Sequence, residues 1–311
     1  MKIYHNIDEF HKLDYAIVTI GTFDGVHLGH QKIISRLEKL AKQNEAETVV
    51  LTFFPHPRMI LHPEDENIRL ITTMAEKAAL LDKLGVDHLI ITPFTRDFSN
   101  LSPEEYIKNI LVDQIGMKHI VIGYDHRFGK NREGGLTDLQ QMGPRYGFKI
   151  EEILQQDIHS VAVSSTKIRQ ALLRGDVETA REFLGYPFTL MGKVIKGDQI
   201  GRKMGFPTAN LFVEEKYKLI PSDGIYAVEI ELSENSSKKY RGMAYIGNRP
   251  TINGMARNIE VNIFDFDQDI YNQCICMHFI RFVRADQKFN SLEELRVQLI
   301  EDERITRAMF K

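Results

Sequence analysis

Residues 21–30 read GTFDGVHLGH and join two segments of opposite character. Before them, residues 15–20 are apolar and β-branched, as in a parallel strand that is buried on both faces. After them, residues 31–44 carry apolar side chains at helical spacing, with basic side chains between. Gly21 and Gly25 permit a tight turn and a close approach of the backbone. The stretch therefore predicts a strand-to-helix crossover whose helix N-terminus, with its unpaired N–H groups, suits a phosphate.

The histidines of this stretch add chemistry to the geometry. His27 and His30 stand at the phosphate-facing end of the predicted helix, and Gly29 between them leaves room for a nucleotide. Imidazoles in that place can donate hydrogen bonds to a phosphoryl group as it gathers charge in a transition state. A histidine pair alone would favour two partly exposed histidines near a turn, but the strand, the glycines and the helix together favour a nucleotide site.

Size and composition narrow the classes of protein. The 311 residues suggest about two domains, and a net charge of −3 at pH 7 disfavours nucleic acid and anionic membranes as partners. Cys274 and Cys276 stand two apart on a predicted strand, where a disulfide cannot form, so we expect small apolar residues in a reducing cytoplasm. We expect no signal peptide, and no apolar run reaches the ~20 residues of a membrane span.

Strands and helices alternate through the first half. Further strands are predicted at 47–54, 88–94 and 118–124, and helices at 73–84 and 102–115. Such alternation indicates βαβ units and a Rossmann-like α/β domain with a parallel sheet. Ligands of such sheets bind beyond the carboxyl ends of the strands.

Two polar loops follow predicted strands. Pro55-His56-Pro57-Arg58 fits either a rigid loop with incidental charge or an anion contact. Residues 123–134 include Asp125, Arg127, Phe128 and Gly129, and a loop rich in glycine and arginine suits phosphates or a dinucleotide.

A third polar segment, SSTKIR at 164–169, opens another predicted helix. Ser164 or Ser165 would serve as its N-cap. Capping does not explain Arg169, one turn further on and able to face the same cleft as the hydroxyl groups.

The pattern changes after Gly185-Tyr186-Pro187. Short strands, predicted at 190–196, 224–232, 240–246, 259–266 and 275–282, indicate a small antiparallel β-barrel. A final helix is expected from about 291 to 301, with Ser291 and Glu294 as a capping box. We therefore predict two domains, residues 1–184 and 185–311.

The second domain has its own candidate site. Residues 197–210 read GDQIGRKMGFPTAN, in which glycines and an arginine can wrap a polyphosphate. Thr208 and Asn210 alternate onto one face and offer the hard oxygen ligands that suit Mg²⁺. Glu260 points away from the apolar face of its strand. Composition alone would make these residues an ordinary hairpin and a solvated carboxylate.

These motifs, in this order and over essentially the whole chain, resemble those of bacterial bifunctional riboflavin kinase/FAD synthetases. His27-Leu28-Gly29-His30 resembles the His-x-Gly-His signature of the nucleotidylyltransferase superfamily, which includes class I aminoacyl-tRNA synthetases. Residues 164–169 resemble the Ser-Ser-Thr-x-Ile-Arg motif that holds the ATP β- and γ-phosphates. Residues 197–210 resemble the riboflavin kinase signature.

The resemblance implies a role for each motif. It makes Glu260 the catalytic base of the kinase, and His27 and His30 the catalytic pair of adenylyl transfer. Residues implied to bind ATP for adenylyl transfer are Gly21, Phe23, Gly29, Ser164, Ser165, Thr166 and Arg169. Residues implied to flank FMN and FAD are His56, Pro57, Arg58, Asp125, Arg127, Phe128 and Gly129. Residues implied to bind the kinase nucleotide are Gly197, Gly201, Arg202, Gly205, Phe206 and Pro207, with Thr208 and Asn210 as metal ligands.

The implied enzyme phosphorylates riboflavin to FMN and adenylylates FMN to FAD, using ATP and Mg²⁺ in the cytoplasm, with no nucleic acid or membrane partner. Two other classes compete. A catalytically silent flavin sensor would not need the intact Glu260, His27 and His30. A tRNA-acting enzyme would carry a Lys-Met-Ser-Lys-Ser string, which is absent here.

Overall fold

The computed structural model describes residues 1–65, 67–124, 126–154, 163–197, 200–232, 238–251 and 254–310. It divides into two compact units, Met1–Ser165 and Thr166–Lys311. Each unit is described by itself. In these described ranges, no helix combines the length and the apolar character needed to cross a membrane.

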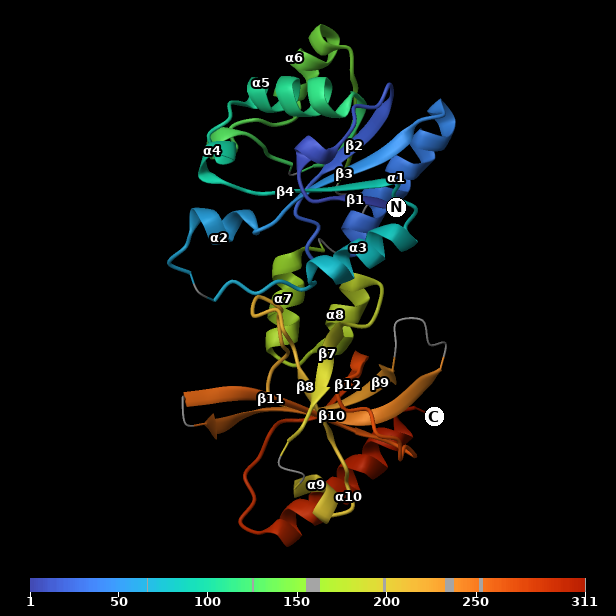
Figure 1. The fold of residues 1–311 in the computed structure, drawn as a ribbon, viewed down its shortest axis with the longest axis vertical. Coiled ribbons are helices and arrows are strands. Elements are labelled where there is room, and N and C mark those ends of the chain that lie inside the picture. Colours follow the sequence, from blue (N-terminus) through green and yellow to red (C-terminus); the bar gives the residue numbers. More distant parts are fainter. Residues whose placement is uncertain are drawn as a thin grey trace. The chain divides into compact units, whose positions relative to one another are not determined.

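The first unit is built on a parallel sheet with the strand order β1-β4-β3-β2-β5-β6 among the described residues (Figure 1). The strands are β1 (Lys2–Tyr4), β2 (Ala16–Ile20), β3 (Glu47–Phe53), β4 (His88–Thr92), β5 (Met117–Gly123) and β6 (Lys149–Ile153). All pairs are parallel, as the alternation predicts. The short edge strands β1 and β6 were not predicted.

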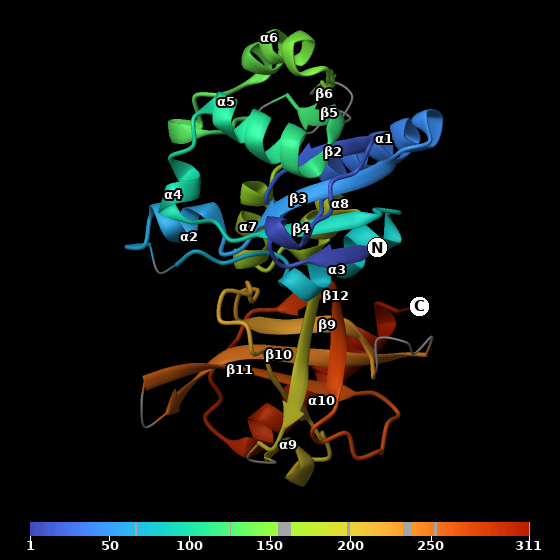
Figure 2. The same cartoon turned by 45° about the horizontal axis from the view of Figure 1, so that its top comes forward.

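Helices cover both faces of this sheet (Figure 2). They are the 3₁₀ turn Ile7–Glu9, α1 (Leu28–Asn44), α2 (Pro57–Leu61), α3 (Met74–Lys83), α4 (Arg96–Ser99), α5 (Pro103–Glu105), the π-helical Tyr106–Ile115, the 3₁₀ turn Lys130–Arg132 and α6 (Leu136–Tyr146). Side chains of α1 and α3 pack with Ile17 on one face, and those of the π-helix and α6 pack with Val18 on the other. Strand β2 is therefore buried along its whole length.

The second unit contains a closed antiparallel barrel with the strand order β10-β11-β8-β7-β12-β9 among the described residues (Figure 1). The strands are β7 (Thr189–Ile195), β8 (Ala209–Phe212), β9 (Gly224–Glu231), β10 (Lys239–Thr251), β11 (Gly254–Ile263) and β12 (Cys274–Arg284). Its helices are α7 (Ser165–Leu173, which begins at the last residue of the first unit), α8 (Val177–Leu184), α9 (Ile200–Lys203) and α10 (Leu292–Ala308). The predicted antiparallel barrel is confirmed.

The last helix starts where predicted and runs longer. The Ser291 hydroxyl accepts a hydrogen bond from the N–H of Glu294, and the Glu294 carboxylate accepts one from the N–H of Asn290. The helix continues past 301 because its last turns are anchored to the barrel: Arg284 donates to both oxygens of the fully buried Asp302, at 2.8 and 2.7 Å.

Candidate active sites

The stretch 21–30 forms the predicted crossover between β2 and α1. Phe23 and Val26 adopt φ of +46° and +35°, a left-handed backbone that non-glycine residues rarely take. The segment before α3 holds this conformation in place. The buried Asp24 carboxylate accepts the N–H groups of Ile71 and Thr72, and the N–H of Gly25 donates to the Thr72 hydroxyl. The loop is therefore preorganised by hydrogen bonds from outside the motif.

The two histidines lie face to face at the start of α1. Their rings stack with centroids 3.6 Å apart, and the buried Phe23 ring meets His30 edge-on at 5.0 Å. His27 is the N-cap, and its Nδ1 accepts the N–H of His30 at 3.4 Å. An accepting Nδ1 places the proton of a neutral His27 ring on Nε2, which can then donate to a ligand.

Burial, reinforced by His27 and Lys77, lowers the pKa of His30 well below its usual value. His30 is therefore neutral near pH 7. A neutral His30 avoids the repulsion that two stacked imidazolium ions would suffer, and it retains one N–H donor. Gly29 is buried between them in the first turn of α1.

Lys77 is a functional candidate that the sequence reasoning missed. Its amine is buried inside the first unit and donates to the carbonyl of Thr22 at 2.6 Å. Burial lowers the pKa of Lys77 to about 8, although the nearby Asp24 carboxylate opposes the shift. Its position gave a signal: Lys77 stands four residues before the buried Leu81, on the apolar stripe of α3.

The serine motif reaches the same crossover. The Ser165 hydroxyl donates to the carbonyl of Asp24 at 3.0 Å, so α7 begins beside the loop 21–30. Ser164 is half-buried just before the helix, and Thr166 is exposed in its first turn. Arg169 lies one turn further along α7, in the second unit.

Strand order places the two other predicted loops at the same edge of the sheet. Strands β3 and β5 flank β2, and the carboxyl ends of parallel neighbours point the same way. After β3, His56 caps α2 through its Nδ1, with Pro57 in the first turn and Arg58 exposed. Asp125, which follows β5, lies outside the described residues.

The rest of the loop after β5 is anchored by its aromatic residue. Phe128 is buried in the core and pairs through its backbone with Gly134. Arg127 is exposed, with its guanidinium against Gly135, and Gly129 adopts a φ of +70°. The burial of Phe128 fixes the loop, and direct contact of this ring with flavin stays a prediction.

The barrel holds a second cluster across the β8–β11 pair. Glu260 lies opposite Asn210 in the strand register. The Thr208 hydroxyl donates to Glu260 Oε2 at 2.9 Å, and the amide of Asn258 donates to Oε1 at 2.7 Å. The structure thus brings together Thr208, Asn210 and Glu260, three of the residues predicted for the kinase site. Asn258 was not predicted, although it stands two residues before Glu260 on the same face.

The glycine-rich segment wraps around this cluster. A Cβ atom on Gly197 would overlap the amide of Asn210, so any larger residue here would displace that side chain. The carbonyl of Gly201 accepts the N–H of Phe206 at 2.9 Å, and Phe206 is buried in a small apolar cluster. Gly205 turns with a φ of +87°, and Arg202 is exposed.

Pro207 is held from the neighbouring strand. The buried Asn262, also not predicted, donates to its carbonyl at 2.7 Å. The backbone just before Thr208 is therefore fixed to β11, the strand that carries Glu260.

The cysteines form no disulfide, as predicted. Cys274 is exposed, and Cys276 is half-buried beside a histidine. They lie on the outer face of β12, whose inner face carries the apolar side chains Ile275, Met277 and Phe279.

Comparison with known proteins gives concordant matches. The FAD synthetase family matches residues 10–167 and the riboflavin kinase family matches residues 184–310. The bifunctional riboflavin kinase/FMN adenylyltransferase of Listeria monocytogenes is 41% identical over 295 residues, covering 94% of this chain and 92% of its own. The protein of the same description from Escherichia coli K12 is 36% identical, covering 98% and 96%.

A solved structure has the same fold. A crystal structure described as the macrolide-efflux protein from Streptococcus pneumoniae superposes with a TM-score of 0.88 at 33% identity, covering 98% of each chain.

Proposed function

The chain belongs to the family of bifunctional riboflavin kinase/FMN adenylyltransferases, and from its geometry we propose which residues carry the two reactions. It phosphorylates riboflavin to FMN and adenylylates FMN to FAD. We assign adenylyl transfer to residues 1–184 and the kinase to residues 185–311. This assignment is supported by the presence of two polar clusters, one at the start of α1 and one across β8–β11. The side chains of the first suit adenylyl transfer, and those of the second suit the kinase reaction.

In adenylyl transfer, a phosphate oxygen of FMN attacks the α-phosphorus of ATP, the bond to the β-phosphate oxygen breaks, and pyrophosphate leaves. His27 and His30 donate N–H groups to the α-phosphate as charge develops. The stacking of the two rings at the start of α1, and the one N–H that a neutral His30 keeps, support this role.

The remaining adenylyl-transfer residues position the ATP. Gly21, Phe23 and Gly29 shape the crossover that faces it. Ser164, Ser165, Thr166 and Arg169 hold the β- and γ-phosphates, and the hydrogen bond from Ser165 to the loop supports this placement. His56, Pro57, Arg58, Asp125, Arg127, Phe128 and Gly129 form the flavin-side loops.

In the kinase reaction, Glu260 accepts the proton of the ribityl 5′-hydroxyl, the oxygen attacks the γ-phosphorus of ATP, and ADP leaves. Hydrogen bonds from Thr208 and Asn258 to its two oxygens hold the carboxylate in one orientation. Gly197, Gly201, Arg202, Gly205, Phe206 and Pro207 wrap the nucleotide.

Thr208 and Asn210 fit Mg²⁺. Their side-chain oxygens are hard ligands two positions apart, and the Thr208 hydroxyl donates its hydrogen bond to Glu260, which leaves its oxygen lone pairs for a cation. When bound, Mg²⁺ neutralises charge on the transferring phosphates.

One assay tests both assignments. Purified full-length protein is given riboflavin, ATP and Mg²⁺, and FMN and FAD are separated by chromatography. His30→Ala should make FMN normally and lose FAD by roughly 10²–10³-fold, the worth of one transition-state donor. The control His62→Ala removes an exposed imidazole of the same unit and should make both products. Equal loss of FMN and FAD in a folded His30→Ala protein would contradict separate sites.

A further inference from the structure

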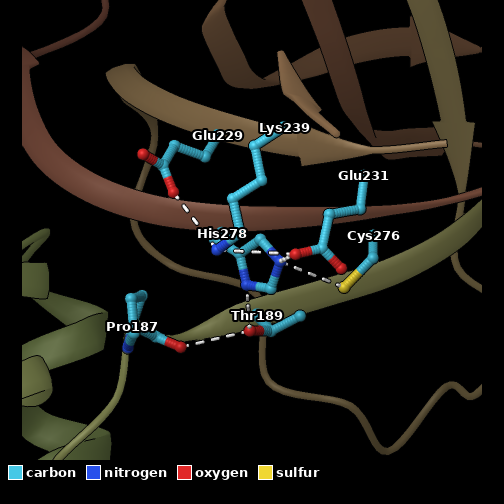
Figure 3. A network of polar contacts seen from close by, with 7 residues as sticks. All are labelled: Pro187, Thr189, Glu229, Glu231, Lys239, Cys276 and His278. Carbon is cyan, nitrogen blue, oxygen red and sulfur yellow. Dashed lines mark hydrogen bonds and ion pairs between the residues drawn. The ribbon is translucent and has the colours of Figure 1, made fainter. Parts of the chain in front are cut away.

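A cluster of potential metal ligands lies on the outer face of the barrel and uses none of the residues assigned to either reaction (Figure 3). Cys276 and His278 stand two apart on β12 and share that face. Glu231, at the end of β9, lies directly opposite Cys276 in the register. A thiol, an imidazole and a carboxylate thus converge from two paired strands.

Two of the three distances between the ligand atoms match those around a tetrahedral ion. His278 Nε2 lies 3.3 Å from Glu231 Oε1 and 3.6 Å from Cys276 Sγ, and the three ligand atoms all lie within 4.8 Å of one another. Zinc binds nitrogen and oxygen at roughly 2.0–2.1 Å and thiolate sulfur at about 2.3 Å, so tetrahedral angles place such ligands about 3.3–3.6 Å apart.

The hydrogen bonds of His278 point its free nitrogen into the cluster. The Thr189 hydroxyl donates its one proton to the carbonyl of Pro187, so its oxygen accepts from His278 Nδ1, 3.1 Å away. The proton therefore sits on Nδ1. Metal-binding histidines are held in this way, with the far nitrogen donating to an oxygen and the near nitrogen bare.

A neighbouring cation competes for the carboxylate but can be displaced. Lys239 lies 3.4 Å from both Glu229 and Glu231. Its side chain is 46% exposed, so it can stay with Glu229 when Glu231 turns to a metal.

We propose that Glu231, Cys276 and His278 bind one zinc-class divalent cation, with Thr189 as the positioning residue and an open fourth position for water. Thiolate and imidazole select such an ion over Mg²⁺, so this site does not compete for the kinase metal. The ion links β9 to β12 through its ligands, and the hydrogen bond of His278 to Thr189 extends the link to β7. It therefore stabilises the closed barrel.

Cobalt tests the site because its spectrum reports the ligands. Tag-free full-length protein is stripped with a chelator and titrated with Co²⁺. We expect one equivalent of Co²⁺ to give a thiolate-to-cobalt charge-transfer band and d–d bands with the intensity of a four-coordinate ion. Added Zn²⁺ should remove both.

Cys276→Ser should abolish the charge-transfer band. The matched control Cys274→Ser, two residues away on the same face of β12, should keep it. Thr189→Val should weaken Co²⁺ binding by about 10–100-fold, the usual effect of removing an outer-shell partner.

A thermal readout separates binding from loss of fold. Zn²⁺ should raise the Tm of the wild type and of Cys274→Ser, and leave that of Cys276→Ser unchanged. If Cys276→Ser does not fold, Glu231→Gln takes its place and should lower the Co²⁺ affinity. The proposal is overturned if the wild type shows no charge-transfer band, if the band survives Cys276→Ser, or if it disappears in Cys274→Ser.

Discussion

Lys77 places an amine in the interior of the first unit, and that burial has an energetic signature. Its pKa of about 8 in the folded protein lies below the ordinary lysine pKa of 10.5, so the folded state binds fewer protons than the unfolded chain between these pH values. Stability therefore rises with pH in that window. At neutral pH the buried charge costs about 3 kcal/mol, since each pKa unit is worth about 1.4 kcal/mol.

Lys77→Met should remove this pH dependence. Between pH 8 and 10.5, the free energy of unfolding of the wild type should rise by up to about 3 kcal/mol relative to that of the variant. Denaturation followed by circular dichroism measures both proteins, since the chain has no tryptophan. Parallel stability curves for the two proteins would show that Lys77 is not buried as a charged amine.

Glu260→Gln tests the kinase base. The amide keeps the shape of the carboxylate, but it cannot accept the hydroxyl proton, so kcat of FMN formation should fall by roughly 10²–10⁴. KM for ATP and riboflavin should change little, because a base acts mainly in the transition state. The control Glu229→Gln changes a strand carboxylate paired with Lys239 and should keep the kinase rate. Near-normal turnover in folded Glu260→Gln would leave Glu260 a structural or metal-orienting carboxylate.

The sequence predicted the residues that form the motifs, but not the distant residues that fix the motif loops by hydrogen bonds. His27, His30 and Glu260 stand in recognisable strings, because the chemistry needs them at fixed spacing. Asp24 and Lys77 act across some 50 residues of chain, through hydrogen bonds to loop N–H and carbonyl groups. Such partners depend on how α3 packs, which local pattern does not specify.

At the scale of elements, the glycine-rich segment before β8 depends on close packing against a side chain. Gly197→Ala should abolish FMN formation, because its Cβ would overlap the amide of Asn210, which lies opposite Glu260. FAD formation from added FMN provides the internal control and should persist. An unchanged rate of FMN formation would mean that this segment does not hold Asn210 in place.

The long, strongly patterned elements were predictable, and the short ones were not. Strand β2 and helix α1 carry unbroken apolar patterns over their length. Strand β1 has three residues, β8 has four, and β6 reads KIEEI with its two glutamates half-buried at the sheet edge. These strands exist because a neighbour offers unpaired backbone groups, and that partner is set by the fold and not by their own composition.

At the scale of the whole molecule, the compact units divide at Ser165 and Thr166, whereas we propose a catalytic boundary at Gly185. The two family matches end at residue 167 and begin at residue 184, and so leave the residues between unassigned. Helices α7 and α8 thus belong to the unit of the barrel. The N–H of Ser222 donates to the carbonyl of Leu172, and Arg281 on β12 pairs with Glu178 at 2.9 Å.

The helical pair also buries apolar side chains in this unit. Val177, Ala180 and Leu184 on α8 are fully buried, as is Leu172 on α7. Burying a Val or Leu side chain stabilises a fold by roughly 1.5–3 kcal/mol. Removing α7 and α8 should therefore cost the barrel several kcal/mol, a large share of the stability of a small domain.

Two fragments separate the boundaries. A fragment of residues 185–311 contains every residue proposed for the kinase reaction, so it should convert riboflavin to FMN. A fragment of residues 166–311 should do the same with a higher Tm, because it keeps the two helices packed on the barrel. Neither fragment should make FAD, since both lack His27 and His30. Thermal melts and chromatography of the products measure each fragment beside the full chain. If both fragments fold but only the full chain makes FMN, the kinase requires the first unit and the assignment to residues 185–311 is wrong.

If both fragments melt at the same temperature, α7 and α8 do not stabilise the barrel, and the folding boundary lies at Gly185.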